Sequence, residues 1–292
     1  MSSEGESRFH MVDVSSLTSV HPRDPRRVML RTDDGVRIEA VYEPSGASVT
    51  ETAVTGTAVT GSAVPGTALA GTAVVVAHGF SGSADRPAVR RAARAFAERG
   101  AAVVTFSFRG HGGSGGRSTV GDREVLDLSA AVRWARELGH ARVATVGFSM
   151  GGSVVLRHAA LERGTDGRVD AVAAVSAPAR WYYRGTAPMR RLHWLVTRPT
   201  GRLVGRYGLH TRIDGRTWDP VPLSPVEAVP LIAPVPLLIV HGDRDAYFPL
   251  DHPRMLAGAG DAELWLEPGM GHAENAADDE LLARLGDWLT RR

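Results

Sequence analysis

From Thr72 onward, short apolar runs alternate with segments in which apolar residues recur every three to four positions. The uncharged apolar runs predict strands that are buried on both faces, and the longer period predicts amphipathic helices. Their alternation predicts an α/β fold: a mostly parallel sheet flanked by helices. The expected strands are 73–77, 102–108, 143–146, 169–175, 235–240 and 263–266, and the expected helices are 86–99, 122–138, 153–163, 251–257 and 278–290.

The chain before this region has a different pattern. Residues 1–22 are polar and predict an N-terminal tail, which leaves one domain at 23–292. Segments 27–32 and 36–42 alternate apolar and polar residues around an Asp-Asp-Gly turn, which predicts a β-hairpin. The domain therefore begins with two antiparallel strands.

Residues 46–71 contain a five-residue repeat, TAVTG-TAVTG-SAVPG-TALAG. Small residues cannot build a core, so we expect a flexible surface loop rather than an elastin-like spring or a recognition element. The uncharged stretch 52–77 is long enough to span a bilayer, but its Thr, Gly and Ala content and Pro65 keep its hydropathy low. No membrane span is expected.

The alternation breaks at 177–234, where arginines, aromatic residues and prolines replace long strands. Apolar faces before and after Pro199 predict a small helical cap inserted into the domain. Nine arginines interleave with aromatic residues in this segment. They could favour an acidic substrate or a membrane surface, but the net charge of the whole chain is only +2. The sequence therefore favours a solvated helix face.

Composition removes several kinds of chemistry. The chain has no cysteine, and all 34 basic residues counted as Lys+Arg are arginine. These absences exclude thiolate nucleophiles, cysteine metal sites and lysine Schiff bases. The small net charge argues against a nucleic-acid partner. The first residues lack the apolar core of a secretion signal, so a cytoplasmic location is expected.

Residues 147–151 read Gly-Phe-Ser-Met-Gly between the third expected strand and a helix-compatible run. A G-x-S-x-G turn that joins a strand to a helix is the nucleophile elbow. Such a turn is too tight for side chains two residues before and after the serine, which itself takes a strained backbone conformation. The hydroxyl of Ser149 would then stand at a helix N-terminus, where developing negative charge is favoured.

A serine hydroxyl needs a base to take its proton, and the base needs an acid to orient it. In an α/β sheet these groups belong in loops at the carboxyl ends of strands. Asp245 follows the fifth expected strand, and His272 follows the sixth. The order Ser149, Asp245, His272 is the order expected when an elbow serine is paired with later strands.

Together these motifs resemble the α/β-hydrolase superfamily, in its serine esterase, lipase and peptidase branch. The resemblance extends from about residue 27 to the C-terminus. It is carried by the "HG" oxyanion-loop motif, the "RGxGxS" turn, the elbow, and the acid and histidine loops, which correspond to His78-Gly79-Phe80, 109–114, 147–151, Asp245 with Pro249, and Gly271-His272.

The resemblance implies roles for individual residues. Ser149 would be the nucleophile, His272 the general base and then the general acid, and Asp245 the group that orients His272. The backbone N–H groups of Phe80 and Met150 would form the oxyanion hole. No cofactor and no metal are implied.

Two assignments depend on weighing neighbours. Asp243 is the rival acid, and the Asp-to-Pro spacing of the family favours Asp245 over it. The cap would supply the acyl or alcohol pocket, with Trp181, Tyr182 and Trp194 as candidate lining residues. The oligomeric state is left open by the sequence.

The implied reaction is cleavage of a carboxylic ester, or a related acyl bond, of a small molecule through an acyl-enzyme intermediate. The same groups can also hydrolyse thioester, lactone, peptide or carbon–carbon bonds, or transfer acyl groups, and fold resemblance does not choose among these reactions. A non-catalytic receptor that uses the same pocket is the alternative from another class.

Two other binding functions are disfavoured. Residues 110–115 match the G-x-G-x-x-G dinucleotide fingerprint after a strand, but no acidic residue ends a following strand about twenty residues later. Asp127 falls inside an expected helix instead. The eleven histidines form no H-x-x-x-H or H-E-x-x-H pair on a helix, so they predict no metal site.

Overall fold

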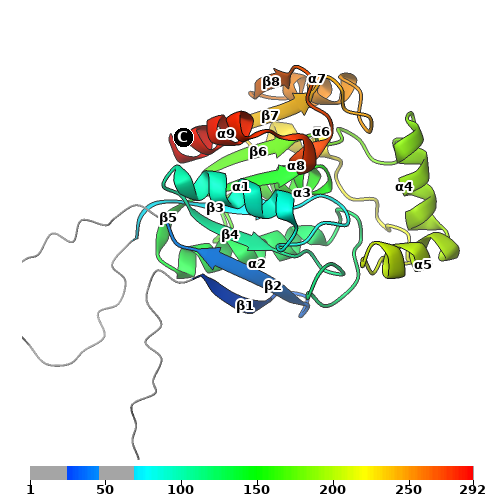
Figure 1. Ribbon diagram of the computed structural model, residues 1–292, viewed down its shortest axis with the longest axis horizontal. Helices are drawn as coiled ribbons and strands as arrows, with labels where there is room; N and C mark the ends of the chain where they lie inside the picture. Colours follow the sequence, from blue (N-terminus) through cyan, green and yellow to red (C-terminus); the bar gives the residue numbers. More distant parts are fainter. Residues whose placement is uncertain (1–24, 46–68, 292) are drawn as a thin grey trace, which may run out of the picture.

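The computed structural model describes residues 25–45 and 69–291, which form an eight-stranded sheet in the order β1-β2-β4-β3-β5-β6-β7-β8 (Figure 1). β2 pairs antiparallel with both of its neighbours, and the pairs from β4 to β8 are parallel. This confirms the predicted mostly parallel sheet. The strands are β1 (Arg26–Arg31), β2 (Arg37–Glu43), β3 (Leu69–Ala77), β4 (Ala102–Phe106), β5 (His140–Phe148), β6 (Ala171–Val175), β7 (Leu237–Gly242) and β8 (Glu263–Glu267).

Helices cover both faces of the sheet (Figure 1). The α-helices of the described residues are α1 (Pro87–Glu98), α2 (Glu124–Glu137), α3 (Met150–Leu161), α4 (Ala187–Thr197), α5 (Pro199–Gly208), α6 (Pro225–Ala228), α7 (Asp251–Gly258), α8 (Ala273–Ala276) and α9 (Asp279–Arg291). Alternate side chains of β3 enter two separate cores: Val75 packs with α2 and α3, whereas Val74 and Val76 pack with α1 and α9. The alternation of the strand therefore fixes a three-layer arrangement.

The expected helices and strands all occur, with ends that shift by a few residues. The largest shift at the elbow is the start of α3, which begins at Met150 and not at 153. Gly151 and Gly152 have poor helix propensity in isolation. Here both are buried against the sheet, and packing outweighs propensity.

Between β6 and β7 the chain forms α4 and α5, which lie together at one end of the molecule (Figure 1). They carry the apolar faces expected before and after Pro199. The predicted tail at 1–22 and nearly all of the predicted repeat loop at 46–71 lie outside the described residues. Within 25–45 and 69–291, none of the helices has the length and apolar character needed to cross a bilayer.

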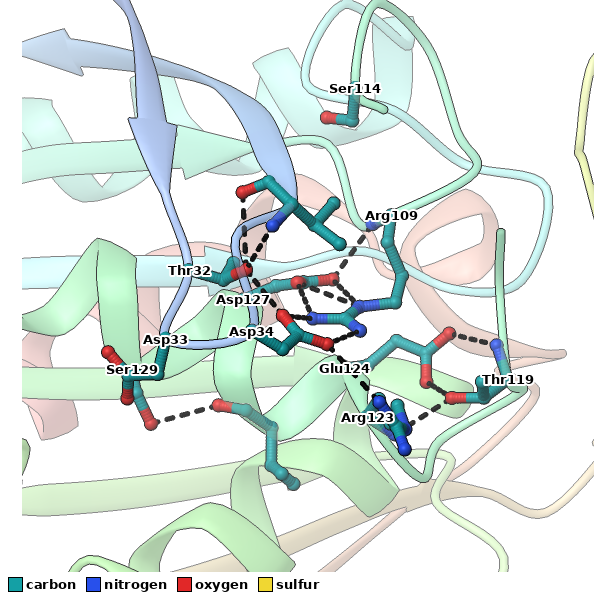
Figure 2. A network of polar contacts seen from close by, with 12 residues as sticks. Thr32, Asp33, Asp34, Arg109, Ser114, Thr119, Arg123, Glu124, Asp127 and Ser129 are labelled. Atoms are coloured by element: carbon teal, nitrogen blue, oxygen red, sulfur yellow. Dashed lines mark hydrogen bonds and ion pairs between the residues drawn. The ribbon is translucent and has the colours of Figure 1, made fainter. Parts of the chain in front are cut away.

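A buried charge network ties the turn after β4 to α2 and to the hairpin (Figure 2). The guanidinium of Arg109 is 3% exposed and donates to Asp127 at 2.7 and 2.9 Å and to Asp34 at 2.7 and 3.0 Å. The backbone N–H of Arg109 also donates to Asp127, at 2.8 Å. From α2, Asp127 therefore accepts hydrogen bonds from both the backbone and the side chain of Arg109, the first residue of the RGxGxS turn. This contact gives Asp127 a structural role.

Replacing Asp127 with asparagine is expected to lower the free energy of unfolding by about 3 kcal/mol, because it leaves a buried guanidinium short of a charge partner. Urea denaturation measures this change. The matched control is Asp33→Asn, whose ion pair with Arg133 is 60% exposed on the aspartate side and should contribute less than about 1 kcal/mol. Equal losses in the two variants would contradict the assignment.

His158 in α3 gives the fold a defined sensitivity to acid. Its side chain is fully buried, neither ring nitrogen has a hydrogen-bond partner among the described residues, and burial lowers its pKa to about 4. In the unfolded chain the pKa of this histidine is near 6.5. Between about pH 4 and pH 6.5 the side chain is therefore protonated in the unfolded state and neutral in the native state. The free energy of unfolding is therefore unaffected by His158 above about pH 6.5, and it decreases as the pH falls from 6.5 toward 4.

The fall in unfolding free energy between pH 7.5 and pH 5 should therefore be about 2 kcal/mol smaller in His158→Leu than in the parent. Urea titrations at the two pH values test this. His210→Asn is the control, because His210 is exposed and its positive φ of 53° suits asparagine. The same pH dependence in the parent and His158→Leu would refute the assignment.

Candidate active site

Ser149 occupies the sharp turn between β5 and α3, with φ 52° and ψ −114°. The two elbow glycines are sterically required. A Cβ atom on Gly147 would lie 2.1 Å from the carbonyl oxygen of Gly151, and one on Gly151 would lie 2.2 Å from that of Ala77. The strained turn raises the Ser149 hydroxyl above the ends of the strands, directly before the first turn of α3.

The structure brings Ser149, His272 and Asp245 into one hydrogen-bonded line. The Ser149 hydroxyl lies 2.8 Å from Nε2 of His272, and Nδ1–H of His272 donates to Oδ2 of Asp245 at 2.7 Å. The three residues come from the ends of β5, β8 and β7, so the parallel sheet itself assembles them. In this line the imidazole can accept the serine proton while the carboxylate stabilises the resulting cation.

Asp245 is held in its ionised form. Burial alone would raise the pKa of its carboxyl, whose side chain is fully buried, but three hydrogen bonds outweigh burial and lower that pKa. They come from His272 and from the backbone N–H groups of Tyr247 and Phe248, at 2.7 and 3.1 Å. The rival Asp243 is exposed and accepts instead from the N–H of Gly269, at 2.7 Å.

Two further contacts hold His272, one at its ring and one at the backbone of the next residue. Tyr247 stacks on it with ring centroids 4.2 Å apart and an angle of 25° between the planes. The next residue, Ala273, donates its N–H to the hydroxyl of Ser176 at 3.0 Å. His241 supports the acid loop, because its Nε2–H donates to the carbonyl oxygen of Phe248 at 2.8 Å, and burial lowers its pKa.

The loop after β3 carries Phe80, the expected partner of Met150. None of the hydrogen bonds between described residues uses the N–H of Phe80 or Met150, whereas both neighbours of Phe80 are bonded. Gly79 donates to Glu274 at 3.1 Å, and Ser81 donates to His111 at 3.3 Å. These bonds hold the loop and leave the two expected oxyanion donors without a partner in the part of the chain that the structure describes.

His78, at the start of the same loop, also holds it in place. Its Nε2 accepts the N–H of Phe108 at 3.0 Å, which places a proton on Nδ1 for donation to the carbonyl oxygen of Gly79 at 2.7 Å. Burial lowers the pKa of His78 to about 3, so it stays neutral and keeps this tautomer near neutral pH. The "HG" motif is thus a brace between β3 and β4.

Sequence reasoning missed Glu274, which is 7% exposed. Besides accepting the Gly79 N–H, its two carboxylate oxygens lie 3.2 Å from where a Cβ of Gly79 would be, and the Cβ of Ser149 lies 3.5 Å from that point. A side chain at position 79 would therefore press against the Glu274 carboxylate. The position of Glu274, two residues after His272, was the one sign in the sequence that it could lie near the site. One sequence does not show in which direction such a side chain points.

A cavity of about 260 Å³ opens beside Ser149 and Met150, between the sheet and α4. Trp181 and Tyr182 line it, as expected from the sequence. Trp194 does not: it is 45% exposed and lies against a separate hollow on the outer side of α4. The inner side of this helix belongs to other residues, at three- to four-residue spacing, which are Met189, Leu192, His193 and Val196.

One wall of the cavity is held in place by a single carboxylate. Residues 118–120 line the cavity, and Glu124 accepts hydrogen bonds from the N–H and hydroxyl of Thr119, at 2.8 and 2.7 Å (Figure 2). It also accepts from the N–H of Gly121, at 2.9 Å. The hydroxyl of Ser118 donates to the same carboxylate at 2.8 Å. Glu124 therefore fixes a loop that lines the cavity.

Comparison with known proteins concerns the sequence and the fold of the chain. The family model for the alpha/beta hydrolase fold matches residues 72–203. Over 108 residues the chain is 40% identical to the Escherichia coli (strain K12) protein YheT, whose assignment as an esterase is provisional. That match covers 36% of this chain and 32% of YheT, so the chain spans about a third of that relative.

Two further comparisons cover more of the chain. A monoacylglycerol lipase of Mycolicibacterium smegmatis is 26% identical over 237 residues, which cover 68% of this chain and 80% of the lipase. The structure of the Pyrococcus furiosus esterase Pf2001 superposes with a TM-score of 0.66 at 22% identity, covering 92% and 90% of the two chains. The fold is that of an α/β hydrolase. In sequence the chain is similar to the alpha/beta hydrolase family model over residues 72–203, and in fold it is similar to this class over most of its length.

Proposed function

We propose that this protein is a serine hydrolase that cleaves carboxylic esters through an acyl-enzyme intermediate. The observation that carries the proposal is the continuous Ser149–His272–Asp245 hydrogen-bonded line beside a cavity and two unpaired backbone N–H groups. Each of these parts has a separate duty in ester cleavage, and the elbow places all of them around one atom, Oγ of Ser149.

In acylation, Oγ of Ser149 attacks the ester carbonyl carbon while its proton passes to Nε2 of His272. The carbonyl oxygen becomes an oxyanion that accepts hydrogen bonds from the N–H groups of Phe80 and Met150. The imidazolium, stabilised by Asp245, then gives the proton to the departing alkoxide, so the alcohol leaves and the acyl group stays on Ser149.

Deacylation repeats these steps with water. His272 takes a proton from water as the water oxygen attacks the acyl carbon, and the same two N–H groups hold the second oxyanion. The carbon–Oγ bond then breaks, and the proton returns from His272 to Ser149. The products are a carboxylic acid and a regenerated enzyme, without any cofactor in the sequence of steps.

The cavity supports an apolar acyl or alcohol portion in the substrate. Its lining contains six aromatic side chains, Phe80, Trp181, Tyr182, Tyr183, Trp218 and Phe248. Apolar walls with a few polar groups are typical of small-molecule sites. The relatives named as an esterase and a monoacylglycerol lipase also act on esters, which favours ester hydrolysis over the other acyl reactions of this fold.

Reaction with a fluorophosphonate tests the proposal directly, because such probes phosphonylate activated serines. We expect one adduct per chain by intact mass spectrometry, located on the peptide that contains Ser149. Turnover of short-chain p-nitrophenyl esters should disappear in step with labelling. A chain that binds ester analogues without labelling or turnover would instead be a receptor that uses the same pocket.

Removing the Glu274 carboxylate should slow the reaction without weakening substrate binding. In Glu274→Ala the N–H of Gly79 loses its partner, and the Phe80 donor shifts from the oxyanion position. We expect kcat to fall about 10- to 100-fold with KM nearly unchanged. Fluorophosphonate inactivation should slow in parallel, since the phosphonyl oxygen uses the same donors.

Two variants make the Glu274 result specific. Glu274→Gln keeps an acceptor for the Gly79 N–H and should recover most of the activity. Glu280→Ala removes an exposed carboxylate from the start of α9 and should leave kcat unchanged. If Glu274→Ala and Glu280→Ala have equal kcat values, Glu274 does not position the loop.

A further inference from the structure

The segment that contains α4 and α5 carries a large local charge. Residues 171–213 include eight arginines and no aspartate or glutamate. Among the ion pairs between described residues, only Arg180 of the eight finds a carboxylate, Asp251 at 2.9 Å. Residues 171–213 thus carry a charge of +8, although the net charge of the whole chain is only +2. Charges attract a partner within a Debye length of about 10 Å, so the local value governs contact.

The same segment exposes apolar side chains, four on α4 and α5 and one, Tyr182, before α4. Ten large apolar side chains are exposed among the described residues, and half of them lie within 26 consecutive positions. These five are Tyr182, Trp194, Leu203, Val204 and Tyr207, with exposed fractions from 45% to 70%. On α5, Leu203 and Tyr207 are four residues apart and so share one helix face. Grouped exposure of this kind marks a contact surface.

The outer side of α4 combines both features. A hollow there is lined by Arg184, Arg190, Arg198, His193, Trp194 and Thr197. Arg190 is held in place by donation to the carbonyl oxygens of Arg184 and Gly185, at 3.3 and 3.2 Å. The pKa of His193 is lowered, first by burial and then by the charges of Arg184 and Arg198, as expected where positive potential accumulates. The hollow is thus suited to an anionic group.

This hollow and the cavity beside Ser149 are neighbours across α4, and His193 and Thr197 line both. Arg190, Trp194 and Arg198 follow each other at four-residue spacing on the outer side, and the cavity side carries Met189, Leu192 and Val196. A helix with side chains is about 10 Å thick. A partner on the outer side would therefore lie close to the candidate active site without entering it.

We propose that α4 and α5 form a docking surface for an anionic phospholipid bilayer. A bilayer offers phosphates to the arginines and an apolar boundary to the exposed tryptophan, leucine, valine and tyrosine side chains at the same contact. Arginine also binds phosphate through two parallel hydrogen bonds. A free anion would satisfy the hollow but would leave the apolar side chains in water.

Vesicle flotation of the full-length chain tests the proposal. The two membranes are pure phosphatidylcholine, and phosphatidylcholine with about one third phosphatidylglycerol. We expect the protein to float with the anionic vesicles and stay at the bottom with the neutral ones, and high salt should weaken the association. Ser149→Ala should bind vesicles as the parent does, so this result is independent of the proposed hydrolase activity.

Two sets of variants locate the surface. Arg184, Arg190 and Arg198 changed together to glutamine should lower the partition coefficient about 100-fold, at about fivefold for each arginine. The matched control changes Arg31, Arg94 and Arg254, which are exposed and lie outside 171–213, and should cost little. Leu203→Ser with Tyr207→Ser should lower binding at least tenfold, whereas Met29→Ser with Leu161→Ser should not.

Three results would overturn the proposal. Equal flotation with neutral and anionic vesicles would remove the role of the arginines. Equal losses of vesicle binding in the two triple arginine variants would mean that the total charge of the protein, and not this surface, determines binding. Release of the protein from vesicles by millimolar inorganic phosphate at constant ionic strength would make the hollow a site for free anions. Far-ultraviolet circular dichroism of each variant verifies that the fold is retained.

Discussion

Replacing Ser149 with alanine is expected to lower kcat for ester hydrolysis about a millionfold, to the rate that the remaining oxyanion donors and the cavity sustain. The substitution removes the hydroxyl that attacks the carbonyl carbon, and Nε2 of His272 lies 2.8 Å from that hydroxyl. Initial rates with p-nitrophenyl acetate and butyrate measure the change, with enzyme concentrations high enough to detect residual turnover.

Ser153→Ala provides a matched control for this loss. Ser153 lies one helical turn after Ser149, lines the same cavity and carries a buried hydroxyl without a partner among the described residues. Its removal should change kcat no more than a few fold. If Ser149→Ala retains activity within tenfold of the parent, Ser149 is not the nucleophile.

The second large effect concerns the acid. Asp245→Asn should lower kcat about ten-thousandfold, because an amide can force the His272 ring into the tautomer that cannot accept the serine proton. The substitution leaves the shape of the buried site nearly unchanged. Asp243→Asn, two residues earlier and exposed, should leave kcat within a few fold, since its carboxylate contacts only the Gly269 N–H among hydrogen-bonded partners in the described part of the chain.

Assays of the two aspartate variants on the same substrates decide between the two acids. Thermal unfolding of each variant separates a chemical loss from a loss of folded protein. Abolished turnover in Asp243→Asn, together with retained turnover in Asp245→Asn, would reverse the assignment made from the Asp-to-Pro spacing.

The fold could be predicted from the sequence because buried strands are unbroken apolar runs and amphipathic helices have a three- to four-residue period. Residues 74–77 illustrate this: a run without polar positions predicts a strand covered on both faces, and its side chains do enter two cores. The ends of the elements were less accessible. α3 begins earlier than its propensity suggests, since burial of Gly151 and Gly152 depends on contacts with distant parts of the chain.

The candidate site could be predicted where spacing alone carries the information. Gly147 and Gly151 have a steric reason that a single turn reveals, and the order Ser149, Asp245, His272 follows from the parallel sheet. Glu274 could not be predicted, because its partner Gly79 is 195 positions away and the contact depends on which way one side chain turns. The same limit explains the misplaced Trp194, since an aromatic residue on an amphipathic helix can face either side.

The two-sided character of α4 constrains how this protein can change. Residues 189, 192 and 196 face the cavity, and 190, 194 and 198 face outward, so the two sets are interleaved within ten positions. Inserting or deleting one residue near the start of α4 would rotate everything after it by about 100°. Such a change would put arginines toward the substrate and methionine and leucine toward the outside. Length variation should therefore be tolerated in the loop before α4 and rejected within the helix.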